Sequence, residues 1–220
     1  MLESVSTFLR VVALVMAALL PLINPPGAAP IFLSLTPGMS DPERGRVAGR
    51  IARDAFVLLT AAMLVGSYVL LLFGLSLAVI RIAGGLLVIA TAWRLLAAEE
   101  SDRPILPRVA SGSDVTGGWT FYPLTFPLTV GPGSLSVTVT LGAGIRQEAA
   151  INVAAIAGSL AGIVVVTVMI YLAYRFASRL VRVLGTSGTV VLLRLSAFIL
   201  LAIGVQILCD GLAERFAWGT

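Results

Sequence analysis

Six long apolar segments determine what this chain can fold into. They cover residues 8–36, 51–73, 79–98, 121–141, 149–174 and 190–212. A helix needs about 20 mostly apolar residues to cross the hydrocarbon core of a bilayer, and each segment reaches that length. Only 12% of the 220 residues are charged, against roughly 25% in an ordinary soluble domain. The sequence therefore predicts an all-α integral membrane protein with six transmembrane segments.

One long polar stretch divides these segments into two sets of three. It reads EESDRPILPRVASGSDVTGGWT, and its proline, glycine, serine and mixed charge are typical of a surface loop. The predicted organisation is a first three-span repeat at 1–98, a cytoplasmic loop at 99–120 and a second three-span repeat at 121–220.

Two correspondences between the halves indicate an internal duplication. NPPGAAPIFLSLT aligns with VGPGSLSVTVTLG so that Pro26 matches Pro132, and Arg81 and Arg194 both lie near the starts of their segments. Long arginine side chains at such places can reach the interface. Because each repeat has three spans, the second copy would enter the membrane from the opposite face. We therefore expect two inverted-topology repeats, with segments 1 and 4 broken at mid-membrane.

Arginine placement predicts the orientation. With six crossings, the loops after the first, third and fifth segments hold ten arginines and the opposite side holds four. The ten are Arg44, Arg46, Arg50, Arg53, Arg94, Arg103, Arg108, Arg175, Arg179 and Arg182. Since cytoplasmic loops carry the excess of basic residues, both termini are expected outside the cytoplasm. Re-entrant segments 1 and 4 would give the same tally, so the count leaves both arrangements open.

The first apolar segment carries helix breakers at its centre, in PLINPPGAAPIFLSLTPG. Proline has no N–H and clashes with the carbonyl four residues earlier, so Pro25 and Pro26 interrupt a continuous helix. The N–H groups of Gly27 and Ala28, in the first turn after the break, would lack helical partners and carry the positive end of a helix dipole. Asn24 offers an acceptor there and could cap the second half-helix.

The second break, PLTFPLTVGPGSLSVTVT, repeats this construction. Pro132 would open a half-helix with free N–H groups, and Gly131 and Gly133 allow close approach of a ligand to the backbone. In inverted repeats the two positive half-helix ends would meet near the midplane and suit a carboxylate, while freed carbonyls suit an ammonium. One proline kink usually only shapes helix packing, but two matching breaks favour a binding site. The candidate substrate-binding residues are Asn24, Pro25, Gly27, Ala28, Pro30, Ser34, Thr129, Gly131, Pro132, Gly133, Ser134 and Thr138.

Several residue types needed for catalysis are missing. The chain has no histidine and no lysine, and Cys209 is its single cysteine. The commonest metal ligand and the commonest general base are therefore absent, and no carboxylate lies clearly in mid-membrane. The sequence gives no indication of an enzyme, a metal site or a bound cofactor. Its basic character follows from the arginines between spans, so no nucleic-acid partner is expected.

The fifth segment carries small residues at four-residue spacing, at Ala154, Gly158 and Gly162. Such a face allows two helices to approach closely. We expect packing within the chain more than a dimer seam, although a homo-oligomer stays open.

Three stretches resemble the signature motifs of the MarC family, six-span inner-membrane proteins of bacteria and archaea. They are NPPGAAPIFLSLT, FGLSLAVIRIAGGLLVIATAWRLL and PLTFPLTVGPGSLSVTVTL, which begin at residues 24, 73 and 123. The resemblance covers the whole chain, with the motifs in the family's order. This sequence departs at Pro26, Thr125 and Phe126, which could alter a pocket. The matching family positions are Asn24, Pro25, Gly27, Pro30, Gly131, Pro132 and Gly133.

The resemblance implies a transporter of small neutral amino acids such as glycine, alanine or serine in a prokaryotic inner membrane. Its partners would be the lipid bilayer and a small zwitterionic substrate, with a proton or sodium ion as the candidate coupling ion, unless it is an exporter. A passive channel for a small solute is the main alternative, although the second break lacks an asparagine. A non-transporting membrane scaffold is the other alternative.

Overall fold

The computed structural model describes residues 2–97, 119–147 and 153–217, and these residues form helices and connecting turns with no strand. The described helices are α1 (Leu2–Ile23), α2 (Pro25–Leu35), α3 (Asp41–Leu72), α4 (Leu77–Ala97), η1 (Thr120–Thr129), α6 (Pro132–Gln147), α7 (Val153–Arg175) and α8 (Ala177–Ala217). The prediction of an all-α protein is confirmed. Nearly all of the predicted loop 99–120 lies outside the described residues.

Five helical stretches are long and apolar enough to cross a membrane. They are Ser4–Leu35, Asp41–Leu70, Leu77–Ala97, Val153–Arg175 and Ser187–Phe216. A sixth span arises if Thr120–Thr129 and Pro132–Ala143, which are bent by 72° relative to each other, form one crossing. Each predicted segment thus overlaps one of these stretches, and the protein has five or six candidate spans.

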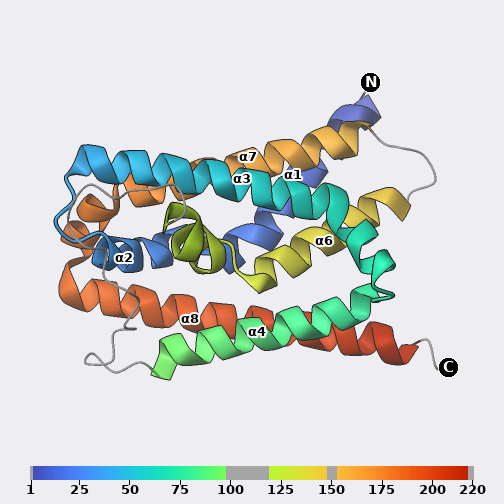
Figure 1. Cartoon of the computed structure of the whole chain (residues 1–220). Coiled ribbons are helices and arrows are strands. Elements are labelled where there is room, and N and C mark those ends of the chain that lie inside the picture. The colour runs from blue at the N-terminus through green and yellow to red at the C-terminus, as the bar shows by residue number, and fades with distance from the viewer. Residues whose placement is uncertain (1, 98–118, 148–152, 218–220) are drawn as a thin grey trace.

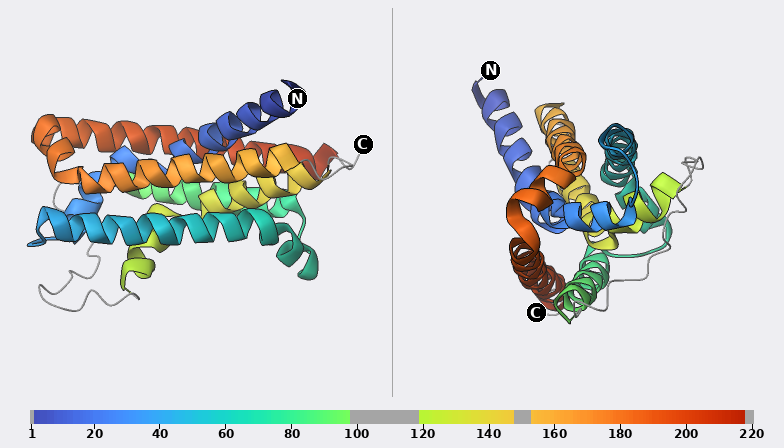
Figure 2. Two further views of the ribbon diagram at one scale, coloured as in Figure 1. Left: turned by 90° about the horizontal axis from the view of Figure 1, so that it is seen from above. Right: turned by 90° about the vertical axis from the view of Figure 1, so that its left-hand side faces the viewer.

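The helices pack in two outer pairs with a middle layer (Figure 1). α3 and α7 lie side by side along one face, and α4 and α8 lie side by side along the other. α2, η1 and α6 lie between these pairs, as the view along the bundle also shows (Figure 2). Because α1 starts and α8 finishes at the same end of the bundle, the two termini lie at that end.

Close helix contacts rely on glycine. A methyl group at Gly158 of α7 would lie 2.7 Å from the carbonyl oxygen of Phe8, and one at Gly162 would lie 2.8 Å from Cβ of Val15. These contacts join α7 to α1, so the small-residue face packs within the chain as expected. α4 and α8 approach in the same way, because Cβ at Gly85 would lie 2.9 Å from the carbonyl oxygen of Gly204.

α3 begins ten residues before the predicted segment at 51. Ser40 precedes the helix, and both its N–H and its hydroxyl donate to Oε2 of Glu43, at 2.8 and 2.7 Å. The bond from the Ser40 N–H to the Glu43 carboxylate is the one that the glutamate supplies in a capping box, S-x-x-E, and it satisfies a donor at the helix start. Asp41 and Glu43 also favour the positive end of the helix dipole. The stretch from residue 41, expected as a loop, is therefore helical.

The opposite end from the termini is rich in arginine. The start of α3, the end of α4 and the junction between α7 and α8 all lie there (Figure 1). We call it the arginine end; its arginines are Arg44, Arg46, Arg50, Arg53, Arg94, Arg175, Arg179 and Arg182. Arg103 and Arg108, which were counted on the same side, lie outside the described residues.

Candidate functional site

The first break is held by Asn24, which separates α1 from α2. Its backbone is left-handed (φ 44°, ψ 61°), and its N–H still donates to the carbonyl of Leu20 at 2.8 Å. The side-chain Oδ1 accepts from the N–H of Gly27 at 3.2 Å, and the backbone carbonyl accepts from the N–H of Ala28 at 3.0 Å. The predicted cap is confirmed. The expectation of unpaired N–H groups at Gly27 and Ala28 is wrong, because Asn24 pairs with both.

Two backbone carbonyls at this break, unlike its N–H groups, lose their hydrogen-bond partners. A helix would pair the carbonyls of Pro21 and Leu22 with the N–H groups four residues later, but Pro25 and Pro26 have none. Within the described part of the chain, no other donor pairs with these two carbonyls. α1 therefore ends inside the bundle with two backbone acceptors available.

The second break leaves donors available. α6 starts at Pro132, and its first internal pairing is the N–H of Leu135 with the carbonyl of Gly131 at 3.1 Å. Among the described residues, no acceptor pairs with the N–H of Gly133 or of Ser134, although both residues are buried. The hydroxyl of Ser134 donates to the carbonyl of Gly131 at 2.8 Å and so does not cap these groups. The free donors expected from the sequence are found at this break alone.

Val88 of α4 lies against the second break and belongs to a cluster that also contacts the end of α1. Its Cγ2 is the nearest atom to a Cβ built on Gly133, and Leu22 packs against the cluster that contains Val88. α6 also approaches α4 closely below this point, where Ser136 donates its hydroxyl to the carbonyl of Ile80 at 2.9 Å. α1 and α6 also contact each other inside the bundle, so the acceptors and the donors are carried by neighbouring helices.

A buried aromatic pair adjoins the second break. The Tyr174 hydroxyl lies 2.8 Å from Oγ1 of Thr129, whose own proton is donated to the carbonyl of Leu124 at 2.7 Å. The tyrosine hydroxyl is therefore the donor to Thr129. Its ring stacks on Phe32 of α2, with centroids 4.6 Å apart and planes within 3°. α2, η1 and α7 meet at this contact.

The other predicted site residues are divided between the interior and the surface. Thr138 is buried one turn further along α6, and its hydroxyl donates to the carbonyl of Ser134 at 2.6 Å. Pro25 is buried and Pro30 is partly buried. Ser34 is exposed and donates its hydroxyl to the carbonyl of Ile31 at 2.8 Å, so the structure does not bring it to the breaks.

Two residues at this site were missed by sequence reasoning. Val88 is one aliphatic residue among many in its segment, and nothing in its neighbourhood marks it. Tyr174 carried a usable signal, because a tyrosine hydroxyl buried in an apolar segment needs a hydrogen-bond partner. That partner, Thr129, lies 45 residues away in the chain, so the pairing could not be read locally.

Fold and site together define a multi-pass helical membrane protein with backbone donors and acceptors gathered at interrupted helices. Residues 9–216 match the MarC family of integral membrane proteins, and the chain belongs to that family. It is 31% identical over 194 residues to a UPF0056 membrane protein of Archaeoglobus fulgidus, with 88% of each chain covered. It is 29% identical over 211 residues to the UPF0056 inner membrane protein MarC of Escherichia coli, covering 93% of this chain and 95% of the relative.

Both names describe membrane proteins, the second an inner-membrane protein, and neither names an enzyme. The family membership expected from the motifs is confirmed. No solved structure gives a significant match to the chain.

Proposed function

We propose that this protein is a secondary transporter of small neutral amino acids such as glycine, alanine or serine. The observation that carries the proposal is that two contacting helices carry free backbone groups of opposite kind, acceptors at the end of α1 and donors at the start of α6. The N–H groups of Gly133 and Ser134 suit a carboxylate at a helix start, and the carbonyls of Pro21 and Leu22 suit an ammonium. A small α-amino acid carries both groups on one carbon atom.

The size of the substrate follows from the same contacts. A Cβ on Gly84 would lie 2.6 Å from Oγ of Ser136, and Val88 occupies the space beside Gly133. We infer that such close packing beside the free N–H groups favours a substrate side chain no larger than a methyl or hydroxymethyl group. This supports glycine, alanine and serine over larger amino acids.

We propose further that the two halves are inverted repeats. α3 and α7, the second helices of each half, run in opposite directions side by side, and so do α4 and α8 (Figure 1). α2 packs on α8, and its counterpart α6 packs on α4. A twofold axis in the membrane plane would produce this exchange of partners. The α1–α2 and η1–α6 pairs would then be the two interrupted spans.

The arginine end is proposed to face the cytoplasm, with both termini on the outer side of a prokaryotic inner membrane. The gathering of arginines at that end supports this orientation. A proton or a sodium ion is the proposed coupling ion if transport is gradient-driven, and an exporter would use the same site. A homo-oligomer is compatible with this arrangement.

Uptake of labelled glycine and alanine into proteoliposomes tests the proposal, with and without imposed proton and sodium gradients. Ser134→Pro removes one free N–H in the first helical turn, where proline is tolerated. Ser134→Ala removes the hydroxyl and keeps that N–H. We expect saturable uptake, with a KM raised at least about tenfold in the proline variant, since a hydrogen bond to a charged group contributes about 1.5–3 kcal/mol. The alanine variant should stay close to the unmodified protein.

Other outcomes would favour the alternatives. Flux that rises linearly with concentration and ignores both gradients would indicate a passive channel. No flux of any small amino acid, from protein that melts cooperatively, would refute both and leave a scaffold. If the proline and alanine variants raised KM equally, the backbone N–H of Ser134 would have no part in binding.

A further inference from the structure

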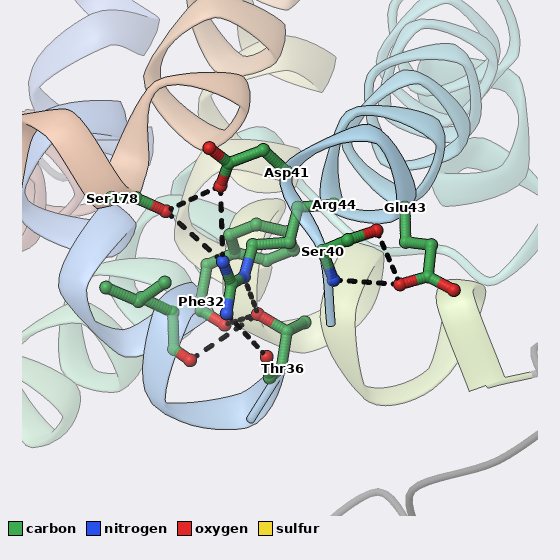
Figure 3. A network of polar contacts seen from close by, with 8 residues as sticks. Phe32, Thr36, Ser40, Asp41, Glu43, Arg44 and Ser178 are labelled. Atoms are coloured by element: carbon green, nitrogen blue, oxygen red, sulfur yellow. Dashed lines mark hydrogen bonds and ion pairs between the residues drawn. The ribbon is translucent and has the colours of Figure 1, made fainter. Parts of the chain in front are cut away.

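Arg44 is a buried charge at the arginine end. Its side chain, on the second turn of α3, is only 15% exposed. Nε donates to Oγ1 of Thr36 at 3.3 Å, and Nη2 donates to the Thr36 carbonyl at 3.1 Å. Thr36 is the residue at which α2 ends, so the guanidinium binds the exposed carbonyl end of that half-helix (Figure 3).

The remaining contacts of Arg44 are with Asp41 of the same helix and with Ser178 in the other half of the chain. Nη1 lies 3.4 Å from Oδ1 of Asp41 and donates to Oγ of Ser178, on the first turn of α8, at 3.3 Å. The Ser178 hydroxyl in turn donates to Oδ1 of Asp41 at 3.2 Å. Figure 3 shows the guanidinium enclosed by Thr36, Asp41 and Ser178. We call Thr36, Asp41, Arg44 and Ser178 the Arg44 network.

An aromatic layer lies directly beneath this network. Phe32 lies one turn before Thr36, whose hydroxyl donates to the Phe32 carbonyl at 2.9 Å, and Tyr174 lies in the last turn of α7, just before the junction that leads to Ser178. The Phe32–Tyr174 stack is fully buried, and Tyr174 reaches Thr129, two residues before Gly131 at the start of α6. A chain of contacts therefore runs from Thr129, beside the second break, through Tyr174 and Phe32 to Thr36 of the Arg44 network.

We propose that the Arg44 network is a latch between the two halves, which closes the arginine end over the second break and opens once in each transport cycle. This inference rests on the proposed transport function. The latch joins the end of α2 and the start of α3 to the first turn of α8, so a ligand that leaves the second break through the arginine end would pass once these helices separate. Its polar groups lie near water at the end of the bundle, so water can replace their hydrogen bonds when the latch opens.

A labelling experiment tests the latch without any substrate. Cys209 is first replaced by serine, and a single cysteine is placed at Ala48, which is fully buried one turn inward from Arg44. In Arg44→Gln we expect maleimide labelling of that cysteine to rise about tenfold, equivalent to about 1.4 kcal/mol. Arg46→Gln removes an exposed charge from the same helix and should leave the rate unchanged. A cysteine at Ala155, in the first turn of α7 at the other end, should show no rise.

One further variant keeps the test decisive. If Arg44→Gln does not fold, Ser178→Ala removes only the contact between the halves and should raise labelling at Ala48 by a smaller factor. The latch would be overturned if the cysteine at position 48 were labelled no faster in Arg44→Gln than in Arg46→Gln. The same comparison applies to Ser178→Ala where it replaces Arg44→Gln.

Transport is tested with cysteines at Asp41 and Ser178, joined by a short bifunctional thiol reagent that a reductant can remove. We expect cross-linking to abolish glycine uptake and reduction to restore it. Uptake at full rate by fully cross-linked protein would refute the latch. No uptake by the unmodified protein would instead refute the proposed function, and that result is distinct because the labelling rates still report whether the network closes this end.

Discussion

Asn24 holds the first break by two separable effects, and single substitutions divide them. Its side chain caps α2 through the 3.2 Å contact with the N–H of Gly27, and its backbone is left-handed at φ 44°. A cap of this kind contributes about 1 kcal/mol, and a left-handed backbone costs a residue such as alanine about 1–2 kcal/mol. Asn24→Ala loses both, so the free energy of unfolding should fall by about 2–3 kcal/mol.

Glycine and serine at this position each lose one effect. Asn24→Gly tolerates the left-handed backbone but has no cap, and Asn24→Ser retains an acceptor but not the conformational preference. Each should cost about 1 kcal/mol, roughly half the cost of alanine. The measurement is unfolding of the purified protein in mixed micelles by titration with dodecyl sulfate, followed by circular dichroism. If alanine costs no more than glycine or serine, the division into two effects is refuted.

Two further substitutions test packing in the same titration. Gly85→Ala places Cβ 2.8 Å from the backbone nitrogen of Leu208 and should lower the free energy of unfolding by about 1–3 kcal/mol through overpacking. Gly49→Ala, where the nearest neighbour of the new Cβ lies at 3.9 Å, should cost nothing. Equal effects of the two substitutions would contradict the close α4–α8 contact. Tyr174→Phe should lose about 1 kcal/mol with its hydrogen bond, and Tyr174→Ala about 3–5 kcal/mol with the ring that stacks on Phe32. A phenylalanine variant as unstable as the alanine variant would refute that division.

The features predicted from the sequence depend on local or covalent properties. The length of the apolar segments predicted the candidate spans. The first break follows from the missing N–H of Pro25 and Pro26, whatever the packing of the helices. The start of α3 was also local, because Ser40 and Glu43 form a capping box, but the nearby charges suggested a loop instead.

The partners of the freed groups could not be predicted. At the first break the N–H of Gly27 turns to a side chain three residues earlier, whereas α6 is preceded by Gly131, which has no side chain to offer. The contacts of Val88 and Tyr174 join residues far apart in the chain, so they follow from packing. Both half-helix starts were expected to offer free donors to one shared site, but the first break leaves acceptors at the end of α1 and only the second leaves donors, at the start of α6.

This asymmetry leads to a prediction in which stability and transport change in opposite directions. Gly131 precedes α6 as Asn24 precedes α2, and a Cβ built there would lie 3.4 Å from the nearest atom, the carbonyl oxygen of Pro127. Gly131→Asn can therefore supply the missing cap to the N–H of Gly133 or Ser134 and should raise the free energy of unfolding by about 1 kcal/mol. The same cap occupies the donors proposed for the substrate carboxylate, so glycine uptake should fall sharply.

Gly131→Ala is the matched control for this substitution, because it adds the same Cβ without an acceptor. It should leave uptake close to that of the unmodified protein and add no cap. An asparagine variant that is more stable and transports normally would show that the N–H groups at the start of α6 do not bind substrate. A loss of uptake with no gain in stability, shared by the alanine variant, would mean that Cβ alone blocks the site. Only a gain in stability together with a loss of uptake, confined to asparagine, supports the assignment of these backbone groups to the carboxylate.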